Sequence, residues 1–231
     1  MTSRTPWTRL IAEGAVVVGS ILVAFAIDAS WDQRRDRVLQ LELLASLQGA
    51  LESNSQLAAA RVEVVLQDRI LLQRFIKMTP VDAGTIPADS TWVFLRSIFR
   101  SNTFDLNTAE VAAILDENPG LLREQPELRA ALAQWRSRSD ALDRQEQQLF
   151  ETYQDVLDAL AGHEELQPAL AQLPGARVIP GLVAARVRQD NEVMRLAARK
   201  AFHSQIQLQF LEQVEADAAA AASLLRAILV R

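Results

Sequence analysis

The longest apolar stretch of this chain lies near its N-terminus. Fourteen consecutive residues, 14–27 (GAVVVGSILVAFAI), carry no charge, and residues 10–12 extend the stretch on the other side of Glu13. A helix that crosses a bilayer core of about 30 Å needs about 20 residues. We therefore predict that residues 10–31 form a transmembrane helix, preceded by a short N-terminal tail at residues 1–9.

Tryptophan and arginine residues flank this stretch. Trp7 and Trp31 lie 24 residues apart, which is about 36 Å along a helix. Tryptophan is enriched at the level of the lipid headgroups, and arginine side chains extend from the membrane into water. We predict that Trp7, Trp31, Arg34 and Arg35 are interfacial anchors. Because two arginines precede the stretch and three follow it closely, the charges do not indicate on which side of the membrane the rest of the chain lies.

Two alternatives remain for the N-terminal segment. A cleaved signal peptide needs a basic start, an apolar run and a site of small residues, and residues 24–26 (Ala-Phe-Ala) offer such a site. Against cleavage, Glu13 interrupts the apolar run and helix-compatible sequence continues through Trp31. The segment could also be a helix buried in the core of a protein.

One side of the predicted membrane helix carries polar and small residues. At 100° per residue, Glu13, Ser20 and Asp28 fall within about 80° of one another. Ala15 and Gly19 form a pair of small residues four positions apart, which allows another helix to approach closely. These five residues are candidates for association between membrane helices. The simpler alternative is that the two acids lie at the two interfaces and contact headgroup water.

Beyond residue 31 the apolar positions recur with the period of a helix in three long segments. They cover residues 32–78, 126–161 and about 190–230, and eight of ten seam positions in the second segment are apolar, as in a coiled coil. Amphipathic helices of this kind bury their apolar stripes against one another. We therefore predict an all-α fold in which the membrane helix continues into an antiparallel bundle of three long and a few short helices, residues 32–231.

The connections between the long segments are marked by turn residues. Residues 79–90 contain two prolines and a glycine and are predicted to be a loop, and residues 173–181 are predicted to be a linker. Short helices are expected at residues 91–100 and 108–117. The second should end at Asn118-Pro119-Gly120.

Composition and charge exclude several classes of function. The net charge of −5 does not suit a nucleic-acid partner, and the absence of cysteine excludes disulfides and a thiol nucleophile. His163 and His203 lie in different predicted elements, without the spacing of metal ligands. The charged residues of 140–151 are interpreted as a solvated surface. We expect no catalytic residue, no metal and no cofactor, and therefore no enzyme.

Two further features are candidates for a functional role. Asn54 occupies an apolar position in the middle of the first long stripe, where a buried polar residue could fix register. The simpler alternative is that Asn54 rotates to the edge of the interface. Residues 100–129 contain many turns and could frame a groove at the end of the bundle, or they could form an ordinary connection.

The order of these features resembles that of a broad group of uncharacterised bacterial proteins with one N-terminal membrane span and a helical domain of similar length. The residues that carry the resemblance are Glu13-Gly14, Gly19, Ile21-Leu22-Val23-Ala24, Trp31, Arg34, Arg35, Leu47, Leu51, Glu52, Asn54, Asn118-Pro119-Gly120-Leu121 and Leu128-Arg129-Ala130-Ala131-Leu132. The resemblance implies a bacterial membrane location and no particular activity.

The sequence therefore favours a single-pass protein of the bacterial inner membrane that acts as a helical interaction or scaffolding module. Its expected partners are membrane lipid and either another protein or a second copy of the chain. The alternative is an extracytoplasmic ligand-sensing domain that signals through a partner.

Overall fold

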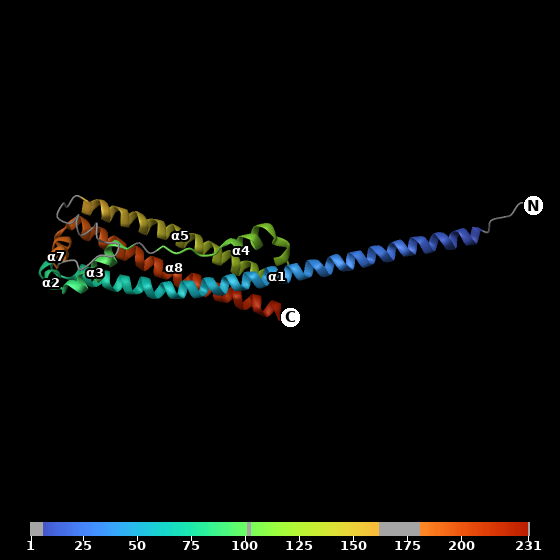
Figure 1. The fold of residues 1–231 in the computed structure, drawn as a ribbon, viewed down its shortest axis with the longest axis horizontal. Helices are drawn as coiled ribbons and strands as arrows, with labels where there is room; N and C mark the ends of the chain where they lie inside the picture. The colour runs from blue at the N-terminus through green and yellow to red at the C-terminus, as the bar shows by residue number, and fades with distance from the viewer. Residues whose placement is uncertain (1–6, 101–102, 162–180, 231) are drawn as a thin grey trace, which may run out of the picture.

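The computed structural model describes residues 7–100, 103–161 and 181–230 (Figure 1), except for the side chains of residues 7–12, 14–17, 88–89, 92, 99 and 181–182. Every regular element in these ranges is helical, which confirms the predicted all-α class. The helices are α1 (Trp7–Lys77), α2 (Pro80–Thr85), α3 (Ala88–Phe99), α4 (Ala109–Ala112), α5 (Pro126–Ala161), α7 (Gly181–Gln189) and α8 (Asn191–Leu229), with a π-helical turn at Ala113–Glu117 and a 3-10 turn at Pro119–Leu122.

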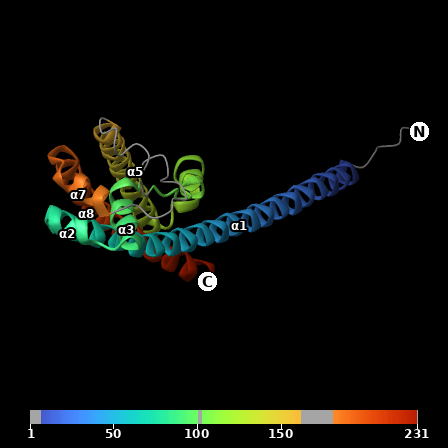
Figure 2. The same cartoon turned by 60° about the vertical axis from the view of Figure 1, so that its left-hand side comes forward.

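Helices α1, α5 and α8 form the bundle. Helix α8 packs against α1 on one side and against α5 on the other. Helices α1 and α5 run in the same direction, and α8 runs in the opposite direction (Figures 1 and 2). The predicted bundle of three long helices is confirmed, and α5 and α8 have nearly the predicted bounds.

Helix α1 is one continuous helix of 71 residues, about 106 Å long at 1.5 Å per residue. The predicted continuation of the apolar segment into the bundle is confirmed. The helix is unbroken there because the connecting residues 32–37 (DQRRDR) contain no helix breaker. The N-terminal part projects beyond the bundle (Figures 1 and 2), and the first buried side chain among those described is Leu44. We call residues 7–43 of α1 the stalk. Within the described part of the chain, we find no helix with a stretch long and apolar enough to cross a membrane.

An extended segment completes the bundle. Residues 103–107, which we call the strap, lead from the end of α3 back to α4 and contact both α1 and α5. Phe104 and Leu106 are buried, while Thr103, Asp105 and Asn107 are exposed. This alternation is the period of an extended chain. The strap thus lies where a four-helix bundle would place its fourth helix.

Three short helices close the end of the bundle that is far from the stalk. Helix α2 packs against α7, and α3 packs against α1, α5 and α7. Arg188 on α7 donates hydrogen bonds from Nε to the carbonyl oxygen of Met78 at 2.6 Å and from Nη2 to that of Ile76 at 2.9 Å. A cation is favourable at the C-terminal end of a helix, where carbonyl groups lack partners. A residue 110 positions away in sequence therefore caps α1.

The predicted loop at residues 79–90 is wrong. Thr79 and Asp82 form a reciprocal capping box that starts α2, with Pro80 in the first turn, and α3 already begins at Ala88. Proline and threonine occur both in loops and at the first positions of helices, so these residues do not distinguish a loop from a helix start. The predicted stop at Asn118-Pro119-Gly120 is confirmed, although the last turn before it is π-helical. The predicted linker at 173–181 lies outside the described residues except for its last position, Gly181, which begins α7.

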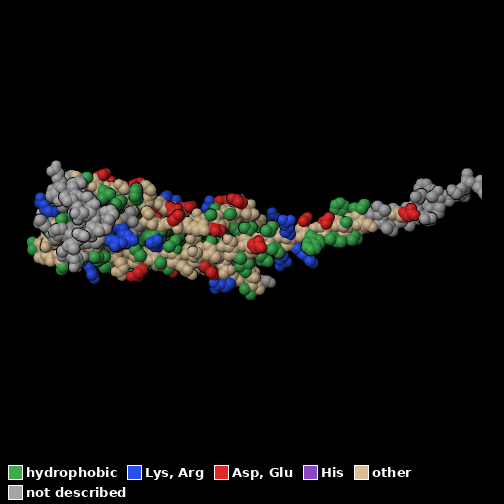
Figure 3. Space-filling view, in the orientation of Figure 1, with side chains coloured by type: hydrophobic (Ala, Val, Ile, Leu, Met, Phe, Trp, Pro, Cys, Tyr) green, Lys and Arg blue, Asp and Glu red, His purple; other side chains and the backbone are tan. Residues whose placement is uncertain are grey.

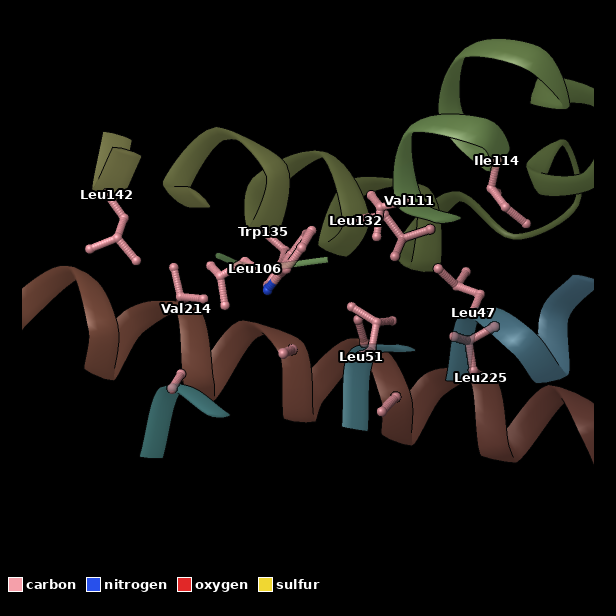
Figure 4. Close-up of a cluster of buried hydrophobic side chains, with 14 of the residues drawn as sticks. Leu47, Leu51, Leu106, Val111, Ile114, Leu132, Trp135, Leu142, Val214 and Leu225 are labelled. Carbon is pink, nitrogen blue, oxygen red and sulfur yellow. The ribbon is translucent and has the colours of Figure 1, made fainter. Parts of the chain in front are cut away.

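The buried side chains form two apolar clusters. The first joins α1, the strap, α4 and the turns after it, α5 and the second half of α8 (Figure 4), and the second lies at the far end around Phe75, Ile98 and Leu160. On α8 the second cluster ends at Ala197 and the first begins at Leu208. Buried polar side chains lie between them along the helices. We call this set the polar layer: Ser97, Gln145, Glu146, Thr152, Lys200, Ser204 and Gln207.

Candidate functional site

The stalk exposes large apolar side chains along its described length (Figure 3). These side chains are 41–67% exposed. Contiguous apolar surface on this scale marks contact with lipid or with another protein. The residues are Val18, Ile21, Leu22, Val23, Phe25, Ile27, Trp31, Val38, Leu39, Leu41 and Leu43.

The predicted membrane-association residues all lie on the stalk. Glu13, Ser20 and Asp28 are exposed, and a Cβ atom added to Gly19 would meet no atom within 4 Å. The side chain of Ala15 lies outside the described residues. Because the stalk is one continuous helix, Glu13, Ser20 and Asp28 share one of its sides as the sequence predicts, whereas Ala15 and Gly19 lie about 100° or more around the helix from them. Their role in association stays a prediction.

The predicted interfacial anchors lie on the same helix. Trp31, Arg34 and Arg35 are exposed, and Trp31 is 67% exposed. Trp7 belongs to the first turn of α1, and its side chain lies outside the described residues. No described contact ties Trp31 to the bundle, and its placement at a lipid headgroup stays a prediction.

A hollow of about 450 Å³ lies where the stalk meets the bundle. Its stalk side is formed by Asp36, Leu39, Gln40 and Leu43, and its other side by residues 117–121. Residues 117–121, within the 100–129 region, thus form a concave surface with α1, which is the groove that the sequence predicted as one alternative for this region. The two charged residues that line it, Asp36 and Glu117, are both acidic.

Asn54 holds the strap to α1. It is 2% exposed, its Nδ2 donates to the carbonyl oxygen of Asn107 at 2.7 Å, and its Oδ1 accepts from the backbone N–H of Asn107 at 3.0 Å. The alternative that Asn54 rotates to the edge of the interface is therefore wrong. Its side-chain amide thus pairs with both backbone groups of one strap residue. Whether it also fixes register stays a prediction.

Phe104 connects the strap to α5 through its backbone and to α1 through its ring. Its backbone N–H donates to Oε2 of Glu146 on α5 at 2.9 Å. The guanidinium carbon of Arg61 on α1 lies 4.5 Å from the centre of the Phe104 ring, within range of a cation–π contact. Phe104 therefore ties α1 to α5 through the strap.

Glu146 is a buried carboxylate in the polar layer. It is 5% exposed, and its Oε1 accepts from Nε2 of Gln207 at 3.2 Å. Burial raises the pKa of the Glu146 carboxyl to about 7, because loss of water disfavours the charged form. The hydrogen bonds from Phe104 and Gln207 and the charge of Arg61 oppose this shift of the pKa, and the charge of Asp143 adds to it.

We expect Glu146→Gln to remove a pH dependence of stability. The folded pKa of about 7 lies above the usual 4.5, so the folded state binds more protons and the wild type loses stability as pH rises through this range. From pH 5 to pH 8, the wild type should lose roughly 2–3 kcal/mol of its free energy of unfolding through this carboxyl group, and the variant should not. The amide can be accommodated if Gln207 rotates to present its oxygen. Urea unfolding at the two pH values measures this difference.

Glu151→Gln is the matched control, because Glu151 is an exposed carboxylate on the same helix. Its free energy of unfolding should follow that of the wild type at both pH values. An unchanged difference between Glu146→Gln and wild type from pH 5 to pH 8 would contradict the assignment of a raised pKa to Glu146.

Lys200 is the buried cation of the polar layer. It is 6% exposed, and its Nζ donates to the carbonyl oxygens of Ser97 and Ile98 at 2.9 Å each and to that of Arg100. Burial lowers the pKa of Lys200 to about 7; the charge of Asp68 opposes this shift and that of Arg100 adds to it. Lys200 thus supplies hydrogen bonds to the last turn of α3, where carbonyl groups have no helical partners.

His203 lies at the edge of the polar layer. Nε2 of Gln145 lies 2.9 Å from its Nδ1 and donates to its carbonyl oxygen at 3.2 Å. Desolvation, followed by the charge of Arg199, lowers the pKa of His203. Within the described residues there is no group of three or more side chains arranged to hold a metal ion. His163 lies outside those residues.

Two charged side chains of the polar layer form hydrogen bonds with backbone groups of the same chain, in the strap and at the end of α3. Glu146 binds the strap and Lys200 binds the end of α3, so both groups have intramolecular partners. The interpretation of the charged residues of 140–151 as a solvated surface is wrong for Glu146, which is buried. The sequence shows that Glu146 occupies a seam position of α5. It does not show that Glu146 is buried there, because its partners Phe104 and Gln207 lie 42 and 61 residues away.

Comparison with known proteins gives no relative: no family model, no curated protein and no solved structure matches this chain.

Proposed function

We propose that this protein is a membrane-anchored helical interaction module, without catalytic activity, of the bacterial inner membrane. In this proposal the N-terminal part of the stalk lies in lipid and the bundle presents helical surfaces to a protein partner. One observation carries the proposal: α1 is a single helix whose N-terminal part exposes large apolar side chains and whose C-terminal part belongs to the core of the bundle.

The geometry of α1 would hold the bundle at a defined height. Trp31, Arg34 and Arg35 would lie at the headgroups, and the first buried residue, Leu44, follows Trp31 by 13 residues, or about 20 Å of helix. Because no turn interrupts this spacer, the bundle cannot move independently of the membrane segment without bending a helix. A rigid spacer of this kind suits a protein that positions a partner near the membrane.

We expect the full chain to sediment with membranes and to resist extraction by alkaline carbonate. A variant that lacks residues 1–31 should be released from the membrane fraction with its helical circular dichroism retained, because the first described core residue is Leu44. As a point variant, Val23→Arg should weaken membrane retention, since a charge near the centre of a bilayer costs about 3 kcal/mol or more.

Extraction of the full chain by carbonate would contradict the anchor. Aggregation of the variant without residues 1–31 would show that the bundle needs its stalk. Arg123→Ala, at an exposed position of the bundle, is the control for effects of substitution alone. A reporter fused to the C-terminus, active on one side of the membrane only, would establish the side on which the bundle lies.

A second candidate function is ligand sensing. A groove of about 320 Å³ lies between α1 and α3, with apolar Val64, Leu71 and Val93 and the arginines Arg96 and Arg100 in its lining. A volume of this size is at the lower end of the range for small-molecule sites. A thermal-shift screen of the protein against small metabolites tests this alternative, and an absence of any shift would leave the interaction module as the better proposal.

A further inference from the structure

The stalk has two different faces just before it enters the bundle. Asp36, Leu39, Gln40 and Leu43 line the hollow opposite residues 117–121 of the same chain. At 100° per residue these four positions lie within about 100° of one another, on the side that continues into the buried Leu47 and Leu51. This inner face of the stalk is therefore directed toward the chain's own bundle.

The outer face is apolar as well. Trp31, Val38 and Leu41 are 67%, 55% and 43% exposed, and they lie within about 80° of one another on the opposite side of the helix. None of the three lines the hollow. Two large aliphatic side chains and an indole on a helix face directed away from its own bundle indicate a partner outside this chain.

The outer face has the spacing of a helix–helix seam. Ala24, Ile27, Trp31, Arg34, Val38 and Leu41 are separated alternately by three and four residues, which is the a/d pattern of two parallel helices. Arg34 is the one charged member, and its long side chain can leave the seam toward the lipid headgroups. After Leu41 the outer face becomes small and polar, with Ala45, Gln48, Gly49 and Glu52.

The charges beside this seam are complementary to those of an identical helix. Arg37 and Glu42 flank Val38 and Leu41 and are five residues apart. In a parallel pair of identical helices, flanking residues at i and i+5 face each other across the seam. Arg37 of each copy would thus face Glu42 of the other, giving two ion pairs. Neither residue has an ion pair within the described part of its own chain.

We propose that the outer face of the stalk binds the stalk of a second copy of this chain as a parallel helix pair from the membrane segment to Leu41. The proposal deepens the proposed function and rests on it, because anchoring in one membrane brings two stalks to the same height and direction. The two bundles then lie on opposite sides of the pair, since each packs on the inner face of its own stalk. Continued toward the N-terminus, the same spacing places Ser20 in the seam.

Single-cysteine cross-linking tests this pairing, because the chain contains no cysteine. We expect Val38→Cys and Leu41→Cys to form disulfide-linked dimers in membranes treated with a mild oxidant. Leu39→Cys and Leu43→Cys are matched controls: these leucines are 50% and 41% exposed, but lie on the inner face. We expect at least fivefold more dimer from the seam variants than from these controls.

Charge exchange gives a second readout. In the Val38→Cys background, Arg37→Glu should reduce cross-linking, and the double exchange Arg37→Glu with Glu42→Arg should restore it. Equal cross-linking at all four positions, or more at Leu39→Cys and Leu43→Cys, would overturn the pairing.

Membrane retention is measured in the same samples. A chain that stays in the membrane without cross-linking at Val38→Cys or Leu41→Cys would overturn the pair and leave the anchor standing. Cross-linking of a chain that is absent from the membrane fraction would overturn the anchor and leave the pair standing.

Discussion

Leu132→Asp should unfold the bundle. Leu132 is fully buried on α5, in the apolar cluster that also contains Trp135 and Val111 (Figure 4). An aspartate there would place an unpaired carboxylate among apolar side chains and leave a cavity where the leucine was. We expect a loss of roughly 4 kcal/mol or more in the free energy of unfolding, which is a large fraction of the stability of a domain of this size. Thermal unfolding of the full chain in detergent, followed by circular dichroism, measures this loss.

Ala133→Asp is the matched control, because Ala133 is the next residue of α5 and is exposed. It introduces the same charge at nearly the same height of the bundle, and we expect a change within about 0.5 kcal/mol. If Leu132→Asp melted at the wild-type temperature, α5 would not contribute to the core as the structure places it.

Lys200→Met should produce the second large effect. The substitution keeps much of the aliphatic side chain but removes the ammonium group that donates to the carbonyl oxygens of Ser97, Ile98 and Arg100. A buried polar group left without a partner costs about 1–3 kcal/mol, and the end of α3 loses its donor. Because the strap follows directly, we expect a loss of roughly 3 kcal/mol in the free energy of unfolding. Amide hydrogen exchange should increase first at the end of α3 and in the strap.

Lys77 is the other lysine of the chain and is exposed at the end of α1, so Lys77→Met is the matched control. It removes the same charge without removing a buried donor. A wild-type stability for Lys200→Met would mean that the three carbonyl groups find other partners and that Lys200 is not required to hold α3.

The long helices were predictable because their information is local. The bounds of α5 agree with the period of its apolar positions, from Pro126 in the first turn to Ala161 before Gly162. Helix α8 begins after Asp190, whose side chain accepts from the backbone N–H of Val193. The period of 3.6 residues and the capping residues are legible within a few turns of sequence.

The strap and its anchors were not predictable in this way. The alternation of Phe104 and Leu106 with exposed residues is a weak signal over few positions. Glu146 resembled the solvated acids around it, and its burial depends on the backbone of Phe104 and on Gln207 of α8. In the sequence, Lys200 is one polar residue near an apolar stripe. Its burial depends on the carbonyl groups of α3, which accept hydrogen bonds from its Nζ.

The sequence by itself determined the all-α class, the three long helices and the unbroken passage from the apolar segment into the bundle, because these follow from periodicity, capping and the absence of helix breakers within each segment. Only the tertiary structure decided that an extended strap takes the fourth position of the bundle and that Asn54, Glu146 and Lys200 hold the backbone of the strap and of α3. It also placed Leu39 and Leu43 toward the chain's own bundle and left Val38 and Leu41 outside. A buried polar side chain is stabilised by partners distant in sequence, and the two faces of a helix differ only once its neighbours are in place.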